Sequence, residues 1–416
     1  MSQNIAPSLL ESTLKKLADA VFPNCGKVMS QAVGLLLGAI TRTGSPLVQS
    51  LAETISEGFT SKKGRQERIS GWLARYDFAR PIQTWLWSAA KATIRRDTVI
   101  ALDGGDLSKE FGGKGMEGME RGYDASRGVV AMGHNLLAAA VVNAPRARAL
   151  HVQLLKGRKG LFQAERALLS RIDAATKGDG IVACDRGFDN QKFISHATGL
   201  SIRTVVRVKD TDRDVFATGR SIPSELATVP GCSAILQSPT RRQKAVIRWE
   251  EGLFPALGGC YPSVLVVSST FDGHTLYLYG FGFGPFASPE EQRKAVVTIA
   301  NAYFCRWSVE VFYQDLKQVF GLEKARVRTF KRLQNLVALC VLAYAGLAHF
   351  LPTCPEASIR LAKAMKENFA AINLPFRTFV ANLRTLLEMT AIRFITGRPP
   401  KRAPPCLTPL LPGFSV

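Results

Sequence analysis

The first part of the chain has the hydrophobic spacing of helices. Apolar residues recur every three or four positions, and no alternating run typical of a strand interrupts them. The expected helices are SLLESTLKKLADAVF (8–22), KVMSQAVGLLLGAI (27–40), SPLVQSLAETIS (45–56), QERISGWLARYDF (66–78) and PIQTWLWSAAKATIRR (81–96). Basic clusters lie in turns between these helices. We therefore expect a helical DNA-binding region over residues 1–96, although a plain packing domain fits the same pattern.

The pattern changes to short apolar runs over residues 97–211. The expected strands are TVIALDGGDL (98–107), HNLLAAAVV (134–142), RALHVQLL (148–155), GIVACDRGFD (180–189) and SIRTVVRVK (201–209). A helix is expected at 162–176 and a shorter one after 189. Three strands in series, followed by alternating helices and strands, predict an α/β layer with a mixed sheet. Asp103 and Asp185 stand at the C-terminal ends of buried strands, where open sheets place their ligands.

Residues 212–286 return to strand patterns, with an Asp-Gly hairpin turn at 272–273. A long helix is expected only after them, because Ser288 suits an N-cap and Pro289 the first helical position. We therefore expect a β-rich insertion that interrupts the α/β core. The second part of the core would then cover 287–352, and a helical C-terminal region with a basic, proline-rich tail would cover 353–416.

The long helix carries a polar stripe. At about 100° per residue, Tyr303, Arg306, Glu310 and Lys317 fall within roughly 60° of one another. Apolar residues occupy the other side, which predicts an amphipathic helix laid against a core. A carboxylate flanked by Arg and Lys suits a site that holds a divalent metal and an anionic polymer together. Taken alone, the stripe also fits a solvated face with helical salt-bridge spacing.

Composition points to a polyanionic partner. The 416 residues include 54 Lys and Arg against 33 Asp and Glu, a net charge of +21, which favours nucleic acid over a membrane surface. The eight Cys are scattered singly, which argues against a zinc site and for a reducing compartment. No signal peptide is recognised, and the apolar run 336–351 is short for a membrane span. A cytoplasmic protein without a membrane partner is expected.

Three carboxylates stand out: Asp103 and Asp185 at strand ends and Glu310 on the long helix. Two strand-end aspartates can converge on a pair of divalent cations, and a helix packed across that edge can supply the third ligand. Mg²⁺ prefers a few carboxylates together with substrate phosphate oxygens. Two such ions stabilise the attacking and leaving oxygens of an in-line displacement. The set therefore predicts phosphodiester hydrolysis and transesterification.

The spacing Tyr303-(2)-Arg306-(3)-Glu310-(6)-Lys317 resembles the Tyr-Arg-Glu-Lys signature of bacterial insertion-sequence DDE transposases of the insertion-sequence-four type. The contexts Leu-Asp103-Gly-Gly and Ala-Cys-Asp185-Arg-Gly-Phe resemble that family's aspartate blocks, so the resemblance covers roughly residues 60–350. It implies an α/β, RNase H-like core that cuts transposon ends and joins them to target DNA in a bacterial cytoplasm.

The resemblance also implies roles for individual residues. Asp103, Asp185 and Glu310 would hold two Mg²⁺ ions, for which Mn²⁺ is a possible substitute. The other signature residues would grip the phosphate near the transferred end; these are Tyr303, Arg306 and Lys317. Some relatives flip a base onto a tryptophan of the β insertion, a role that falls to Trp249, the only Trp there. Because two double-stranded ends are brought together in synapsis, a dimer on DNA is expected.

Several nearby residues have more ordinary interpretations. Asp106 is expected to lie beyond the apolar run that leads to Asp103, and Asp189 suits an N-cap. Asp315 is about 140° around the helix from Glu310 and is expected to be a solvated charge. Lys109 and Arg186 either steady phosphate or neutralise carboxylates. The glycine-rich stretch 112–128 is expected to continue as a loop.

Two other functions remain open. One is a metal-dependent nuclease on the same core without strand transfer. The other is a catalytically silent, domesticated DNA-binding protein.

Overall fold

The computed structural model describes residues 5–23, 25–55, 61–109, 115–124, 128–157, 160–212, 215–216, 222–256, 259–354, 361, 363 and 376–396. Contacts divide the chain into two compact units. The first, here the helical unit, comprises Met1–Tyr76, Asp315–Ala325 and Leu342–Val416. The second, here the sheet unit, comprises Asp77–Gln314 and Arg326–Val341. The long helix α9 (Pro289–Gln318) contributes residues to both.

The helical unit confirms the first four helices expected at the start of the chain. Its main helices are α1 (Ile5–Val21), α2 (Lys27–Thr43), α3 (Val48–Thr54), α4 (Lys62–Arg75) and α12 (Phe376–Thr396). Arg384 of α12 donates to the carbonyl of Thr41 at 2.8 Å and to that of Val319 at 2.6 Å. Gly44 ends α2 with a φ of 61°, and a Cβ there would meet the Arg384 guanidinium. This glycine therefore lets α12 close onto the end of α2.

The described strands of the sheet unit form one ten-stranded mixed sheet. They are β1 (Val99–Ser108), β2 (Glu120–Asp124), β3 (Val129–Val141), β4 (Arg148–Leu155), β5 (Ile181–Cys184), β6 (Arg203–Arg207), β7 (Cys232–Gln237), β8 (Arg242–Ala256), β9 (Gly259–Thr270) and β10 (Thr275–Phe281). The order is β2-β3-β1-β5-β6-β10-β9-β8-β7, with β4 paired to β3. Strand β1 is antiparallel to β3 and parallel to β5, and β5 is parallel to β6. The expected mixed α/β fold is confirmed and is consistent with an RNase H-like fold.

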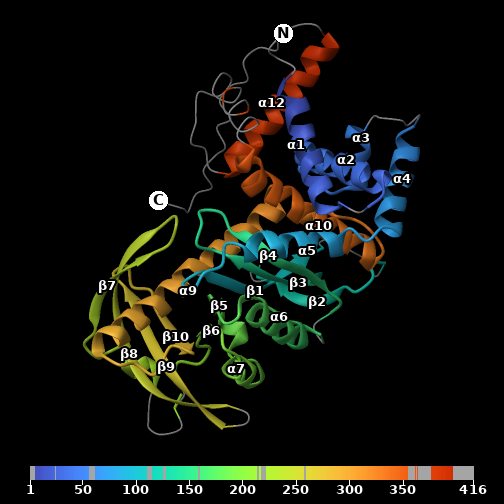
Figure 1. Cartoon of the computed structure of the whole chain (residues 1–416). Helices are drawn as coiled ribbons and strands as arrows, with labels where there is room; N and C mark the ends of the chain where they lie inside the picture. Colours follow the sequence, from blue (N-terminus) through green and yellow to red (C-terminus); the bar gives the residue numbers. More distant parts are fainter. Residues whose placement is uncertain are drawn as a thin grey trace. The chain divides into compact units, whose positions relative to one another are not determined.

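Helices cover both faces of this sheet (Figure 1). Apolar residues of α6 (Leu161–Thr176) and α7 (Gln191–Thr198) share one buried core with Leu102, Val182 and Cys184 of the central strands. On the other face a Cβ at Gly105 would lie 3.1 Å from the ring of Tyr313, so α9 packs closely on β1 there. Residues of β1 that alternate with the core positions therefore point toward α9.

Helix α5 (Ala79–Lys91) belongs with the sheet by its contacts. The amide of Gln83 donates to the carbonyl of Leu150 at 2.9 Å and accepts from the N–H of Val152 at 3.0 Å, both in β4. The boundary expected at residue 96 lies after this helix, whereas the contacts place α5 in the sheet unit.

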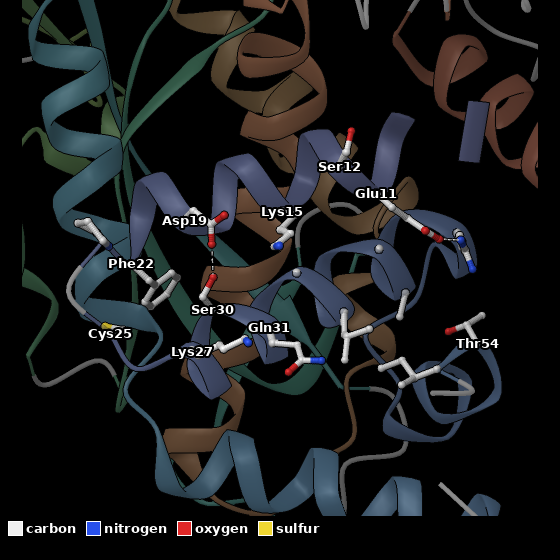
Figure 2. A pocket seen from close by; sticks show the side chains of 17 residues that line it. Glu11, Ser12, Lys15, Asp19, Phe22, Cys25, Lys27, Ser30, Gln31 and Thr54 are labelled. Carbon is white, nitrogen blue, oxygen red and sulfur yellow. Dashed lines mark hydrogen bonds and ion pairs between the residues drawn. The ribbon is translucent and has the colours of Figure 1, made fainter. Parts of the chain in front are cut away.

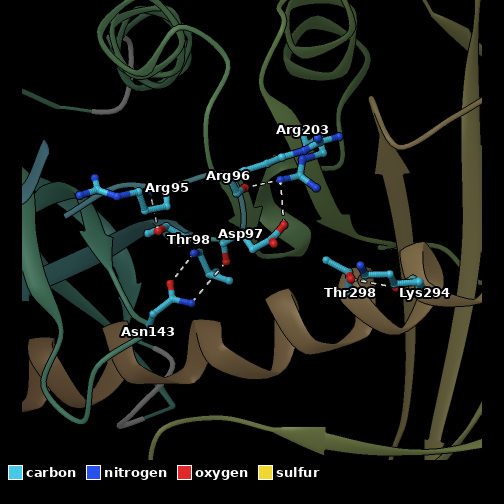
Figure 3. A network of polar contacts seen from close by, with 9 residues as sticks. Arg95, Arg96, Asp97, Thr98, Asn143, Arg203, Lys294 and Thr298 are labelled. Carbon is cyan, nitrogen blue, oxygen red and sulfur yellow. Dashed lines mark hydrogen bonds and ion pairs between the residues drawn. The ribbon is translucent and has the colours of Figure 1, made fainter. Parts of the chain in front are cut away.

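A polar network fixes the start of β1 (Figure 3). Thr98 Oγ1 accepts from the N–H of Arg95 at 2.8 Å, and Asn143 accepts from the N–H of Val99. Arg203 at the start of β6 reaches Asp97 at 3.3 Å. These contacts tie the N-terminal end of β1 to Asn143 and to the start of β6.

The strands expected over 212–286 are present, but they do not form a sheet of their own. Strand β10 pairs with β6 from Leu278↔Arg207 to Phe281↔Thr204, so β7 to β10 extend the core sheet. A separate insertion subdomain is therefore not confirmed.

Strand β2 lies within the stretch 112–128 that was expected to be a loop, so that expectation is wrong for residues 120–124. It pairs with an N-terminal extension of β3 that the sequence pattern did not indicate. Its sequence, Glu-Arg-Gly-Tyr-Asp, is polar and contains a glycine, so its strand conformation comes from its partner and not from a local pattern.

The most apolar segment runs from Phe330 to Thr353, through α10 (Phe330–Ala345), η3 (Gly346–Phe350) and η4 (Leu351–Thr353). It is long and apolar enough to cross a membrane, yet 72% of its apolar window is buried inside the protein. Burial of this kind confirms the core helix expected there. The remaining short elements are η1 (Arg186–Phe188), α8 (Pro223–Leu226) and η2 (Leu322–Lys324).

Candidate active site

The start of α9 is fixed by its first residues, as the sequence predicts. Ser288 Oγ accepts from the N–H of Glu291 at 3.2 Å, and the Glu291 carboxylate accepts from the N–H of Ala287 at 2.7 Å. Reciprocal bonds of this kind satisfy N–H groups that a helix start leaves unpaired. The cap therefore sets where the residues of the polar stripe fall along the sheet.

Asp103 and Asp185 lie side by side because β1 and β5 are parallel neighbours. The last residues that pair are Leu102 and Cys184, so Asp185 follows β5 directly, as expected for a strand end. Asp103 is not at the end of its strand, because β1 continues to Ser108 in its pairing with β3. Leu102 and Cys184 point into the core on the α6 side. By alternation, the two aspartates point toward α9 on the opposite face.

Helix α9 brings its polar stripe onto these carboxylates. Arg306 Nη1 lies 3.3 Å from Asp103 Oδ2, and its Nη2 lies 2.6 Å from Glu310 Oε1. Tyr303 donates its hydroxyl to Asp185 Oδ1 at 2.8 Å, and its ring centroid lies 5.1 Å from the Arg306 guanidinium carbon. Asp103, Asp185 and Glu310 are thus gathered around one guanidinium, although they lie far apart in the sequence.

The pKa values of the two aspartates are shifted in opposite directions. Burial raises the pKa of Asp103 to about 7; Arg306 opposes the rise, while Asp185 and Glu310 add to it. Burial also pulls the pKa of Asp185 upward, but Arg306, the Arg186 N–H, Tyr303 and Arg207 together hold it below its usual range. The two neighbouring carboxyls therefore differ in how readily they ionise.

Two residues of this site were missed in the sequence. Arg207 ends β6, and its Nη1 lies 3.7 Å from Asp185 Oδ1. The hydroxyl of Tyr313 donates to the carbonyl of Asp103 at 3.0 Å. Arg207 carried a usable signal, because parallel neighbouring strands end at one sheet edge and Arg207 closes the strand after Asp185. Tyr313 carried none, since its partner is a backbone group.

The other candidate residues occupy different positions in the fold. Lys317 belongs to the helical unit, where its Nζ lies 3.1 Å from Glu323 Oε1. Lys109 is buried directly after β1, and Arg186 is exposed directly after Asp185. Trp249 is half-buried in β8, in register with Val266.

Three of the ordinary interpretations are wrong. Asp106 does not lie beyond its strand but within β1, where it pairs with Asn135 of β3. Asp189 does not cap α7; it is buried and accepts from the N–H of Lys209 at 2.7 Å, while Asn190 accepts from the N–H of Phe193 at 2.9 Å. Asp315 is not solvated but buried, 2.7 Å from Nε of Arg377. Asp189 and Asn190 are adjacent residues with equal capping ability, so a shift of one position decides the cap.

The carboxylates suit a divalent ion by chemistry but not by their present arrangement. Oxygen ligands of this kind are what Mg²⁺ prefers. Among the described residues, however, no three Asp, Glu, His or Cys side chains are grouped closely enough to hold an ion. The reason lies in the geometry above, because Arg306 occupies the space between Asp103 and Glu310.

A groove in the helical unit is lined mainly by α1 and α2 (Figure 2) and has a volume of about 770 Å³. Its charged residues are of both signs, with Glu11 paired to Arg42 and Asp19 bonded to Ser30. Because the charged residues that line this groove have both signs, they do not indicate which kind of ligand would bind there.

Comparisons with known proteins address the family. The model of a family described as "Transposase DDE domain" matches residues 94–345. A solved structure of a piggyBac transposase synaptic complex with hairpin DNA is similar at 12% identity, over 96% of this chain and 81% of that chain, with a TM-score of 0.41. Similarity at that level is too low to assign a partner. No curated protein matches the chain.

Proposed function

The chain belongs to the transposase DDE domain family, and we propose that it binds the ends of its own insertion sequence, cleaves DNA there and joins the freed 3′ ends to target DNA. As a DDE transposase it is an enzyme. The observation that carries the proposal is the convergence of Asp103, Asp185 and Glu310 around Arg306. That cluster lies within the matched residues.

DDE transposases generally use divalent metal ions. We assign Asp103, Asp185 and Glu310 as the residues that would hold two Mg²⁺ ions, with Mn²⁺ as a substitute. Such ions, when bound, stabilise negative charge on the attacking and leaving oxygens of a phosphodiester.

The protein's own groups orient the carboxylates and the DNA. Tyr303 and Arg207 fix Asp185 from α9 and β6, and Tyr313 fixes the backbone at Asp103. Arg306 is placed to neutralise a phosphate of the end, because a guanidinium donates to phosphate oxygens in pairs. We assign the same partner to Lys317.

Two further residues, Arg186 and Trp249, are proposed to contact DNA, and Lys109 is assigned its alternative role. Arg186 is exposed beside Asp185 and would contact a backbone phosphate. Lys109 is buried, which favours its alternative role of neutralising nearby carboxylates. Trp249 keeps the proposed role of stacking on a flipped base.

The helical region at the start of the chain would bind the transposon end. Helix α4 follows Ser61, whose Oγ accepts from the N–H of Gly64 at 3.1 Å, and its sequence KKGRQERISGWLAR carries five basic residues and one acid. Lys62, Lys63 and Arg68 are exposed on it. Exposed basic groups near a helix start suit the phosphates of double-stranded DNA. Because two ends must be synapsed, we propose that the chain acts on DNA as a dimer.

A joining assay tests this function. A pre-cut end with a free 3′-OH is mixed with plasmid DNA and Mg²⁺, and joining by wild type is compared with joining by Asp103→Asn. We expect wild type to join and the variant to lose joining by about 100-fold or more, the scale of losing one charge-stabilising group. Asp106→Asn is the matched control, since Asp106 lies on the same strand but alternates to the other face.

The outcome also separates the alternatives. Cleavage without joining by wild type would identify a nuclease of the same family instead. Equal joining by wild type and Asp103→Asn would refute the assignment of the site.

A further inference from the structure

The side chain of Arg306 is more deeply buried than expected for a residue that only contacts DNA. Its side chain is 6% exposed, while those of Asp103 and Glu310 are 13% and 31% exposed. It bridges the two carboxylates with different nitrogens, at 3.3 and 2.6 Å. Its Nε is buried and has no hydrogen-bond partner among the described residues. The Arg306 guanidinium therefore has two carboxylate partners, while its Nε–H lacks a hydrogen-bond partner among the described residues.

This position has a consequence for metal binding. A divalent ion that uses Asp103 and Glu310 must bind the carboxylates that Arg306 now contacts through one oxygen each. A buried guanidinium beside them repels a second cation, and the low local dielectric strengthens that repulsion. Among the described residues, no three Asp, Glu, His or Cys side chains are close enough to hold a metal ion, which agrees with this competition. Arg306 and the ion therefore compete for the same two carboxylates.

The surroundings of the carboxylates indicate which of the Arg306 contacts can be replaced by a phosphate. Asp185 is held by Tyr303 at 2.8 Å and by Arg207 at 3.7 Å, so its orientation does not depend on a bridge from Arg306. Of the two carboxylates that Arg306 contacts, Glu310 is the more exposed, at 31% against 13% for Asp103. The contact with Glu310 is therefore the more accessible of the two contacts that Arg306 makes with carboxylates.

We propose that Arg306 is a resident cation that blocks metal binding in the free protein, and that a DNA phosphate draws it away from Glu310, so that DNA and metal bind cooperatively. The inference rests on the proposed function, because it takes DNA and a divalent ion as the partners. A phosphate can accept from two guanidinium nitrogens at once and so replace the carboxylate contacts. The coupling is reciprocal, since each ligand must raise the affinity for the other by one factor.

The test measures Mn²⁺ binding to the full chain by electron paramagnetic resonance, with and without a short duplex carrying the element's end. Without DNA, Arg306→Gln is expected to bind Mn²⁺ about tenfold more tightly than wild type, within the usual range of coupling between sites. The duplex should tighten Mn²⁺ binding by wild type by a similar factor and leave Arg306→Gln nearly unchanged. Arg293→Gln, an exposed change on the same helix, should behave like wild type.

A measurement on wild type alone covers the case in which Arg306→Gln does not fold. Duplex affinity is measured with and without Ca²⁺, a non-reactive probe ion, and Ca²⁺ affinity with and without duplex. The two factors should be equal and greater than one.

Three results would overturn the coupling. They are equal Mn²⁺ affinity of wild type and Arg306→Gln, tightening of both by DNA to the same extent, and no effect of Ca²⁺ on duplex affinity. If no Mn²⁺ binds to any form with or without DNA, the metal site fails, and the proposed function fails with it. Bound Mn²⁺ without coupling would refute this inference alone.

Discussion

At the scale of residues, burial decides the behaviour of the acidic groups. Asp185 is contacted from two elements, by Tyr303 of α9 and Arg207 of β6, and its pKa lies below the usual range, where burial is offset by Arg306 and these neighbours. Glu165 of α6 shows the opposite case. It is buried, its Oε2 has no partner among the described residues, and burial raises its pKa to about 7. One carboxyl is stabilised as an anion and the other as a neutral acid.

Glu165 therefore predicts a pH-dependent loss of stability. Its pKa is raised on folding from the ordinary value of 4.5 to about 7, so the folded state binds more protons than the unfolded state between these pH values. Stability from the neutral form is present at low pH and is lost as the pH rises through about 7. We expect Glu165→Gln to match wild type at pH 5 and to exceed it at pH 8 by at least about 1 kcal/mol, the scale of one pKa unit.

Thermal unfolding at the two pH values measures this difference. Glu290→Gln, the same change at an exposed position, should alter neither. A stability difference between Glu165→Gln and wild type that is the same at both pH values would contradict the prediction.

At the scale of elements, the spacing between α9 and β1 sets the distance between Glu310 and the aspartates. Gly105 lets the ring of Tyr313 approach β1, and the Tyr313 hydroxyl bonds to the carbonyl of Asp103. Protein interiors are packed closely enough that one added methyl group is felt at such a contact.

Two neighbouring glycines test this spacing. A Cβ at Gly105 would lie 3.1 Å from the Tyr313 ring, whereas a Cβ at Gly104 would meet only the Leu136 carbonyl at 4.0 Å. We expect Gly105→Ala to lower end cleavage by about tenfold or more and to cost about 1 to 3 kcal/mol of stability. Gly104→Ala is the matched control and should do neither. Equal cleavage by both variants would show that this contact does not set the site.

The sequence predicted individual helices and strands better than the contacts between them. Asp103 and Asp185 were recognisable because each follows an apolar run, and Glu310 because helical spacing links it to Arg306. Arg207 was missed, because its role requires knowing that β6 pairs with β5. Asp315 was misread, because its partner Arg377 lies 62 residues away and helical geometry gives no sign of it. Local patterns fix residues on their own element, whereas contacts between elements depend on the sheet order.

At the scale of the whole molecule, charge is the dominant property. The chain carries a net charge of +21, and exposed basic residues lie in both units, among them Lys63 in α4 and Arg186 beside the site. Domain organisation was less predictable than charge. The sequence suggested a boundary before the first strand and a β insertion, but α5 packs on the sheet and β7 to β10 extend it. Neither packing partner is visible in the hydrophobic pattern of these segments.

This charge predicts DNA binding that weakens steeply with salt. Neutralising phosphates releases counterions, so the logarithm of affinity should fall linearly with the logarithm of salt concentration. With several phosphates contacted, affinity for a duplex should fall by at least about 100-fold between about 50 and 200 mM NaCl. Fluorescence anisotropy at a series of salt concentrations measures the slope. An affinity that does not change with salt would contradict a phosphate-based interface.

The central claim is that Glu310 completes a metal-dependent cleavage site with Asp103 and Asp185. The measurement that tests it most directly is Mg²⁺-dependent cleavage of DNA carrying the element's own ends, by wild type and by Glu310→Gln. Glu290→Gln on the first turn of the same helix is the control and should cleave like wild type. We predict that wild type nicks the end, while Glu310→Gln binds the same DNA with similar affinity and cleaves it at least about 100-fold more slowly. Equal cleavage by wild type and Glu310→Gln, or binding by both without cleavage by either, would contradict the account.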